Sequence, residues 1–340
     1  MSAPAGFVRS TVNEIASGVF YVPDVMSNVY MIGSPGAPWL LVDAGLRGTG
    51  PWIKRAASRA FGQGARPEAI VLTHAHFDHV GALQDLAEEW NVPVWVHPLE
   101  LPYVTGMADY PEPDPTVGGF MAQMSRLFPN GGINIGERAR VYDRVVLPVL
   151  SEWHIIHTPG HSAGHVSFFR ERDRTMIVGD AFITVNQDSA VDVITQRRQL
   201  THPPNYLTTD WPAARASVRK LADLRPNVVA TGHGLPMAGP QLASDMQYFA
   251  DHFDEQVPKH GRYVAQPVVS DETGPVRIPP PVPDPVGKAI TGVAVGAVAG
   301  LGIYMLTRRG TGDRHVSKAE LKRSPYALGS QRGTSSRYLR

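Results

Sequence analysis

The chain has 340 residues, of which 43% are hydrophobic and 19% charged, so its length and composition allow a sizeable buried core. It contains no cysteine, which excludes disulfides, zinc–thiolate sites and cysteine nucleophiles. The formal net charge is +1, which argues against nucleic acid as the main partner, and the 13 histidines leave nitrogen and oxygen ligands for any metal.

The first part of the sequence alternates short apolar runs with helical patterns. Apolar runs that end at glycine or polar residues predict strands at 19–22, 29–33, 39–45, 69–73 and 92–97. The spacing of apolar residues predicts helices over about 51–60 and 80–90. This alternation is typical of an α/β protein, in which polar residues at strand ends gather at a sheet edge.

A long segment, 101–132, follows and is rich in Pro, Gly and Met, with one helix expected at about 118–127. Long loops in compact domains often cover a site, so this loop and the segment 182–206 are expected to shape a pocket; a plain surface excursion is the alternative. Regular elements then resume, with strands expected at 144–147, 153–157, 165–170, 175–180 and 228–234, and helices at 211–224 and 240–256.

The composition changes towards the end of the chain. We expect a catalytic domain over 1–262, a Pro-rich linker over 263–287, a transmembrane or membrane-associated helix over 288–307, and a basic, disordered tail over 308–340. The uncharged run 289–306 would reach roughly 27 Å as a helix, close to the minimum for spanning a bilayer. A flexible Gly/Ala linker is the alternative.

Within that run, Gly292, Gly296 and Gly300 lie four residues apart, a spacing that favours close helix packing and therefore a homo-oligomer. The N-terminus lacks the basic start and apolar run of a signal peptide. We therefore expect an enzyme on the cytoplasmic face of the cell membrane, anchored through its C-terminal part, with a soluble cytoplasmic protein as the alternative.

The stretch THAHFDHVG, residues 73–81, follows directly after the apolar run AIVL. It places three histidines and an aspartate within six residues at a strand end, and imidazole and carboxylate are good ligands for zinc and related ions. A solvated histidine-rich loop is the alternative. Three later strands also end in polar residues next to glycine, in the stretches HTPGHSAGH (157–165), VGDAF (178–182) and TGHG (231–234).

THAHFDH, TPGHSAGH, GD and GHG, in that order, resemble the metallo-β-lactamase superfamily, and within it a glyoxalase-II-like bacterial metallo-hydrolase. The resemblance extends over roughly residues 18–239. It implies an α/β (α+β) fold class, a four-layer αββα sandwich with the site at one edge between two sheets.

The resemblance also implies two divalent metal ions, with zinc expected and iron or manganese as alternatives. The first ion would be bound by His74, His76 and His161, the second by Asp78, His79 and His233, with Asp180 bridging them. Asp43 and His165 are expected to support the ligands from behind by hydrogen bonds.

The expected function is a metal-dependent hydrolase in which a metal-bridging hydroxide attacks an ester-like small-molecule substrate: a thioester, lactone, ester or phosphoester. Asp78 is the candidate catalytic residue, because it could orient the nucleophile or assist proton transfer. The alternatives are a mononuclear iron persulfide dioxygenase-like oxidoreductase and a non-catalytic membrane adaptor.

Overall fold

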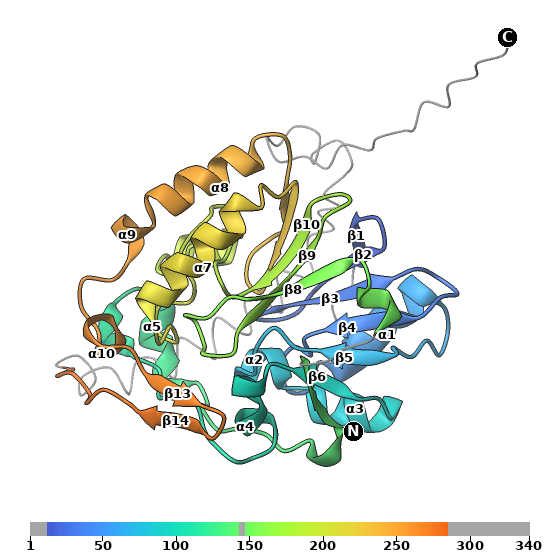
Figure 1. Cartoon of the computed structure of the whole chain (residues 1–340), viewed down its shortest axis with the longest axis horizontal. Helices are drawn as coiled ribbons and strands as arrows, with labels where there is room; N and C mark the ends of the chain where they lie inside the picture. The colour runs from blue at the N-terminus through green and yellow to red at the C-terminus, as the bar shows by residue number, and fades with distance from the viewer. Residues whose placement is uncertain (1–11, 143–146, 285–340) are drawn as a thin grey trace, which may run out of the picture.

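The computed structural model describes residues 12–142 and 147–284 of the chain, which build two mixed β-sheets packed face to face (Figure 1). The seven strands of the first sheet lie in sequence order, β1 to β7, and the five strands of the second in the order β12-β11-β10-β9-β8. The strand predicted at 144–147 lies almost entirely outside the described residues.

The first sheet is antiparallel from β1 to β4 and parallel from β4 to β7. Its parallel part brings the C-terminal ends of β4, β5 and β6 to the same edge, where their connecting loops begin. Its strands are β1 (Asn13–Ala16), β2 (Val19–Pro23), β3 (Asn28–Gly33), β4 (Trp39–Val42), β5 (Ala69–Val71), β6 (Val94–Val96) and β7 (Ala139–Val141).

The second sheet contains one parallel pair, β10 with β11, and is otherwise antiparallel. The parallel pair brings the ends of these two strands to the same edge, which positions the polar turns that follow them. Its strands are β8 (Trp153–His157), β9 (Val166–Arg170), β10 (Thr175–Gly179), β11 (Val228–Thr231) and β12 (Met237–Ala238).

Helices cover the outer face of each sheet (Figure 1). One core joins the first sheet to α1 (Gly50–Phe61) and α3 (Leu83–Trp90), and another joins the second sheet to α7 (Trp211–Asp223) and α8 (Leu242–Asp251). A third core, including Tyr30 and Phe168, fills the space between the sheets. Because each sheet buries both faces, the result is the four-layer sandwich expected from the sequence.

The remaining elements are short and lie mainly in loops. The helices are α2 (Phe77–Val80), α4 (Leu101–Val104), α5 (Phe120–Met124), α6 (Ala190–Thr195), α9 (Phe253–Gln256) and α10 (Arg262–Ala265). The 3-10 turns are η1 (Pro98–Glu100), η2 (Pro115–Val117), η3 (Ser125–Leu127), η4 (Gly136–Arg138) and η6 (Pro148–Leu150).

The helix predicted at 80–90 begins earlier and is divided into α2 and α3 around Gly81. This glycine packs on the loop after β4: a Cβ there would lie 2.2 Å from the backbone nitrogen of Arg47, so no larger residue fits. Its N–H donates to the carbonyl of Gly45 over 2.7 Å, and the N–H of Ala44 donates to the carbonyl of His79 over 2.7 Å. The first motif is thereby held against the end of β4.

The expectation of an extended linker from residue 263 was wrong for its first part. Residues 262–277 form α10 and a hairpin of β13 (Val269–Asp271) and β14 (Gly274–Arg277), which lies beside α4 (Figure 1). Tyr263 is buried and donates its hydroxyl to the carbonyl of Glu112 over 2.6 Å, so burial and hydrogen bonds override the proline-rich composition.

In the part of the chain that the structure describes, no helix has the length and apolar character needed to cross a bilayer. The segments expected to form a membrane helix (288–307) and a basic tail (308–340) lie outside the described residues.

Candidate metal centre

Seven predicted ligands come together where strand ends of the two sheets meet. Two follow β5 in the turn that leads into α2, two lie in α2 itself, one lies in the loop between β8 and β9, and one each follows β10 and β11. All are buried, with at most 4% of any residue exposed: His74, His76, Asp78, His79, His161, Asp180 and His233. A close set of seven buried polar side chains is costly unless they are paired or bind an ion.

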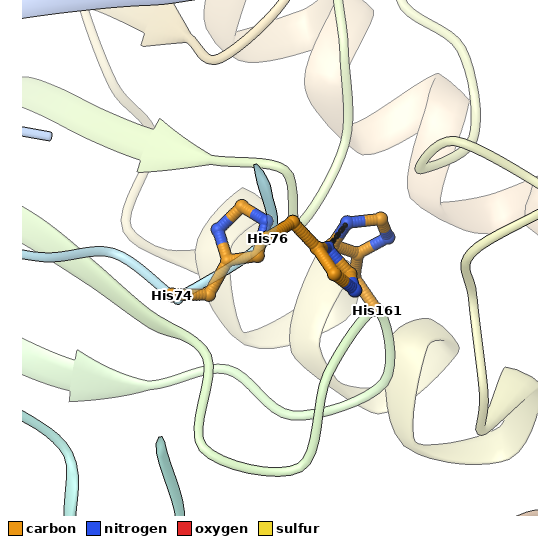
Figure 2. A group of neighbouring side chains, drawn as sticks. All are labelled: His74, His76 and His161. Carbon is orange, nitrogen blue, oxygen red and sulfur yellow. Dashed lines mark hydrogen bonds between the residues drawn. The ribbon is translucent and has the colours of Figure 1, made fainter. Parts of the chain in front are cut away.

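The ligand atoms form three overlapping groups, within each of which they lie within 4.8 Å of one another. Figure 2 shows the side chains of one of these groups, His74, His76 and His161, close together. The groups are His74–His76–His161, His74–His79–Asp180 and Asp78–His79–His233. These buried His/Asp clusters are consistent with a binuclear metal site.

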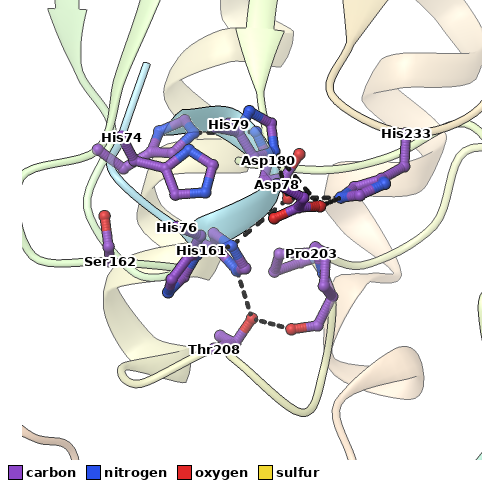
Figure 3. A network of polar contacts seen from close by, with 12 residues as sticks. His74, His76, Asp78, His79, His161, Ser162, Asp180, Pro203, Thr208 and His233 are labelled. Carbon is purple, nitrogen blue, oxygen red and sulfur yellow. Dashed lines mark hydrogen bonds and ion pairs between the residues drawn. The ribbon is translucent and has the colours of Figure 1, made fainter. Parts of the chain in front are cut away.

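Asp180 lies between the histidines of the different groups (Figure 3). Its Oδ2 atom is 3.0 Å from Nε2 of His233, 3.5 Å from Nε2 of His161 and 3.6 Å from Nε2 of His79. Two nitrogens bound to one tetrahedral zinc ion are about 3.3 Å apart, so these separations suit ligands of shared ions.

Hydrogen bonds determine which ring nitrogen of His79 and of His233 faces the centre. Nδ1–H of His79 donates to Oδ2 of Asp43 over 2.9 Å, and Nδ1–H of His233 donates to the carbonyl of Met26 over 2.8 Å. Because each Nδ1 carries the proton, the Nε2 lone pair of each neutral ring is left for an ion.

Two buried threonines determine in the same way which ring nitrogen of His74 and of His161 carries the proton. A hydroxyl has one proton to donate; Thr73 donates it to Asp43 over 2.7 Å and Thr208 donates it to the carbonyl of Pro204 over 2.8 Å. Each hydroxyl therefore accepts from the neighbouring Nδ1–H, at 3.0 Å from His74 and 3.2 Å from His161. Nε2 again faces the centre.

His76 has the opposite orientation. Its Nδ1 lies 2.9 Å from Nε2 of His161, which carries no proton when Nδ1 of that ring donates to Thr208. Without metal, a proton on Nδ1 of His76 makes this contact a hydrogen bond, and a cation held by both rings would take the place of that proton. The pair therefore suits a cation bound by both rings.

Three ligand atoms of the described residues are buried without a hydrogen-bond partner: Nε2 of His74, Nε2 of His79 and Oδ1 of Asp180. Most buried polar atoms have a partner, so unpartnered ligand atoms gathered at one place favour the binding of a metal ion. Nitrogen and oxygen donors in this number fit divalent transition ions. The residues present thus fit the two metal ions expected from the sequence.

Burial and opposite charge act differently on the titratable groups. Burial alone would raise the pKa of Asp180, but His233 and His79 hold it well below its usual value. Burial opposes the charge on His79, yet Asp180, Asp78 and Asp43 raise its pKa well above the usual value. For His76, burial dominates and lowers the pKa to about 3. Without metal, the Asp180 carboxylate thus pairs with His79 and His233, whose pKa values are raised.

A family model described as "Metallo-beta-lactamase superfamily" matches residues 22–233, which contain all seven ligands. This chain belongs to the metallo-β-lactamase superfamily. The probable metallo-hydrolase YflN of Bacillus subtilis (strain 168) is 42% identical to it over 253 residues, covering 73% of this chain and 96% of that protein.

Two further similar proteins have lower sequence identity. The probable metallo-hydrolase YybB of Bacillus subtilis (strain 168) is 29% identical over 49% of this chain and 64% of that protein. A beta-lactamase domain protein from Burkholderia ambifaria has a similar crystal structure, with a TM-score of 0.50 and 20% identity over 75% of this chain and 77% of that one. The structural likeness supports the fold alone.

Both residues expected from the sequence to support the ligands lie behind them. Asp43 accepts from the N–H and hydroxyl of Thr73 over 2.8 and 2.7 Å as well as from His79. His165 accepts from the backbone N–H of Asp180 at Nε2, over 2.9 Å, while its Nδ1 contacts the Thr158 hydroxyl over 2.8 Å.

Sequence reasoning missed several residues that hold this superfamily site together. Thr73 is part of the first motif and could have been suspected. Glu100 lies at the end of η1, and Thr208 and Tyr110 lie in loops; all three are far from their partners in the chain, and no local pattern marks them as supporting residues. The rings of His97 and His157 stack on each other, with 4.3 Å between their centroids, and neither residue is in any of the ligand groups.

Proposed function

We propose that this protein is a two-metal hydrolase that cleaves an ester-like bond in a small molecule: a thioester, lactone, ester or phosphoester. Membership of the metallo-β-lactamase superfamily and the similarity to a protein named as a metallo-hydrolase support hydrolysis. The observation that carries the proposal is the set of unpartnered lone pairs on His74, His79 and Asp180, which face one another in a buried centre.

His74, His76 and His161 would hold one ion, and Asp78, His79 and His233 the other, with Asp180 shared. Zinc suits this set of nitrogen and oxygen ligands, and iron or manganese would suit it as well. Divalent ions bound here would lower the pKa of a water ligand to about 7 and polarise the carbonyl or phosphoryl oxygen of the substrate.

The protein's own groups orient the reactants. Oδ2 of Asp78 lies 3.4 Å from Nε2 of His233 and 4.0 Å from Nε2 of His79, so its carboxylate is at the centre and can accept a proton from the attacking water. The hydroxyl of Ser27 donates to the backbone carbonyl of Asp78, which holds this residue in place. Burial of all seven ligands limits the access of bulk water.

Metal analysis of the purified protein, combined with assays on thioesters, lactones, esters and phosphodiesters, tests this function. We expect about two equivalents of a divalent ion and turnover of at least one substrate class. One equivalent of iron together with oxygen uptake on a persulfide would instead support the dioxygenase alternative. The second group, Asp78–His79–His233, favours the two-metal hydrolase, because a mononuclear centre needs only one such set. The narrower likeness to glyoxalase II stays a prediction.

A further inference from the structure

A fourth buried carboxylate lies beside the metal centre and belongs to none of its ligand groups. Glu100, the last residue of η1, is 0% exposed. Within the described part of the chain its hydrogen-bond partners are all neutral: two backbone N–H groups, a serine hydroxyl and a tyrosine hydroxyl. Burying a carboxylate without a cationic partner costs free energy of folding, so its position calls for an explanation.

The two carboxylate oxygens of Glu100 divide between the two loops that carry the three-histidine group. Oε2 accepts from the backbone N–H of Ala75 over 3.1 Å, and Ala75 stands between His74 and His76. Oε1 accepts from the Ser162 hydroxyl over 2.7 Å and from the N–H of Gly164 over 2.9 Å, next to His161. One rigid carboxylate therefore connects the two loops.

Tyr110 strengthens the same connection from the long loop after α4. Its hydroxyl donates to Oε2 of Glu100 and accepts from the N–H of Ala75 over 3.0 Å. Its ring lies 4.2 Å from the ring of His76 and stacks on Tyr103 at 3.8 Å. Tyr110 thus holds the His76 ring from one side while Glu100 holds the backbone beside it.

The loop around Gly164 is shaped for this contact. A Cβ on Gly164 would lie 2.7 Å from Cγ of Glu100 and 2.9 Å from its backbone nitrogen, so the glycine allows the loop to approach the carboxylate. The distance between the loops is consequently determined by direct contact and by the three hydrogen bonds that they donate to Glu100, and not by loop length alone.

We propose that Glu100, together with Tyr110, is a positioning residue that sets His74 and His76 against His161 and thereby determines the affinity of this group for its metal ion. The inference rests on the two-metal site of the proposed function. A cation bound to the three neutral imidazoles also balances the negative charge of Glu100, which has no cationic side chain among its partners in the described chain.

The substitution Glu100→Gln tests this role with little change in volume. The new NH₂ group must face either the N–H of Gly164 or the N–H of Ala75, so one loop loses its acceptor whichever way the amide turns. We expect zinc titrations against a competing chelator to show one of the two equivalents bound about ten- to one-hundredfold more weakly, and the other unchanged. The absorption bands of the Co²⁺-loaded protein should shift as well.

Matched variants separate positioning from folding. Glu88→Gln makes the same change on the exposed face of α3 and should bind both equivalents as the parent does. Tyr110→Phe should weaken the same equivalent as Glu100→Gln, and the double variant should lose less than the sum, because both act on one contact. Tyr248→Phe, at a 66% exposed tyrosine, is its control.

Two results would overturn the positioning role: parent-like affinity for both equivalents in Glu100→Gln, or an equal loss of both with a large fall in the Tm of the metal-free protein. A parent protein that binds no zinc, cobalt or iron would instead refute the two-metal function itself.

Discussion

Oδ2 of Asp43 accepts from Nδ1–H of His79 over 2.9 Å and also from the Thr73 hydroxyl, which in turn accepts from His74. Asp43 therefore helps to orient one ligand proposed for each of the two metal ions. Its backbone has a φ of 59°, a left-handed conformation that Asp and Asn tolerate better than most residues. Asp43→Asn therefore keeps the backbone while changing the hydrogen bonds. An amide NH₂ must face either the Thr73 N–H or the Nδ1 of His79, which would move the His79 proton to Nε2.

We expect Asp43→Asn to weaken zinc binding about ten- to one-hundredfold, measured by chelator competition. Asp85→Asn, on the exposed face of α3, is the control for the same chemical change. Unchanged affinity in Asp43→Asn would show that Asp43 does not determine the His79 tautomer.

His76→Ala and Asp180→Ala should each abolish turnover of the ester-like substrate without unfolding the protein. The first removes one of three nitrogens of a group, and the second removes the carboxylate between His161, His79 and His233. Initial rates and circular dichroism measure the two effects. The control is His154→Ala, whose side chain is 64% exposed on β8. Parent-like turnover in both variants would contradict the mechanism.

Gly232 lies against the ligands, and its replacement should damage the centre directly. A Cβ at this position would lie 2.0 Å from Oδ1 of Asp180 and 2.8 Å from Cε1 of His79. We expect Gly232→Ala to displace the Asp180 carboxylate and to lower zinc affinity and turnover together. Gly131→Ala is the matched control, because the nearest atom to its Cβ would be 3.7 Å away. Equal zinc affinity in the two variants would show that the ligands can shift to make room for the added methyl group without loss of binding.

The metal-free protein should lose stability as the pH falls below about 6.5. Burial lowers the pKa of His76 and of His165 to about 3, and that of His74 and His161 well below the usual value. Between pH 6.5 and these values only the unfolded chain takes up the protons, so each histidine costs up to about 1.4 kcal/mol per pH unit. His79, whose pKa is raised, is protonated in both states there and adds no slope.

The Tm of the metal-free protein at pH 7.5 and pH 5.5 checks this prediction, with His154→Ala expected to show the same slope as the parent. A Tm that rises on acidification would contradict the neutral, buried state of these histidines.

The membrane anchor stays a prediction, because residues 288–307 lie outside the described chain. If the segment 289–306 holds the enzyme at the membrane, the full chain should sediment with the membrane fraction, and a chain that ends at residue 285 should not. Cell fractionation followed by detection of both chains measures this. Equal solubility of the two chains would contradict a membrane anchor in this segment.

Local spacing in the sequence was sufficient for most of the elements and for the candidate ligands. α1 and α7 begin and end within about one residue of the predicted bounds, because their apolar faces repeat with the helical period over many residues. β7 and β12 were not predicted, since they have three and two residues and are strands only through pairing with β6 and β11.

The first motif could be recognised from the sequence because its ligands are neighbours in the chain, and a cluster of His and Asp at a strand end is typical of a metal site. Which nitrogen of His79, His161 and His233 faces the centre was decided only by the tertiary structure, because their acceptors come from distant segments: Thr208 is 47 residues from His161. Glu100 is likewise 25 residues from Ala75 and 62 from Ser162, so the contact that joins the two ligand loops exists only once the chain has folded.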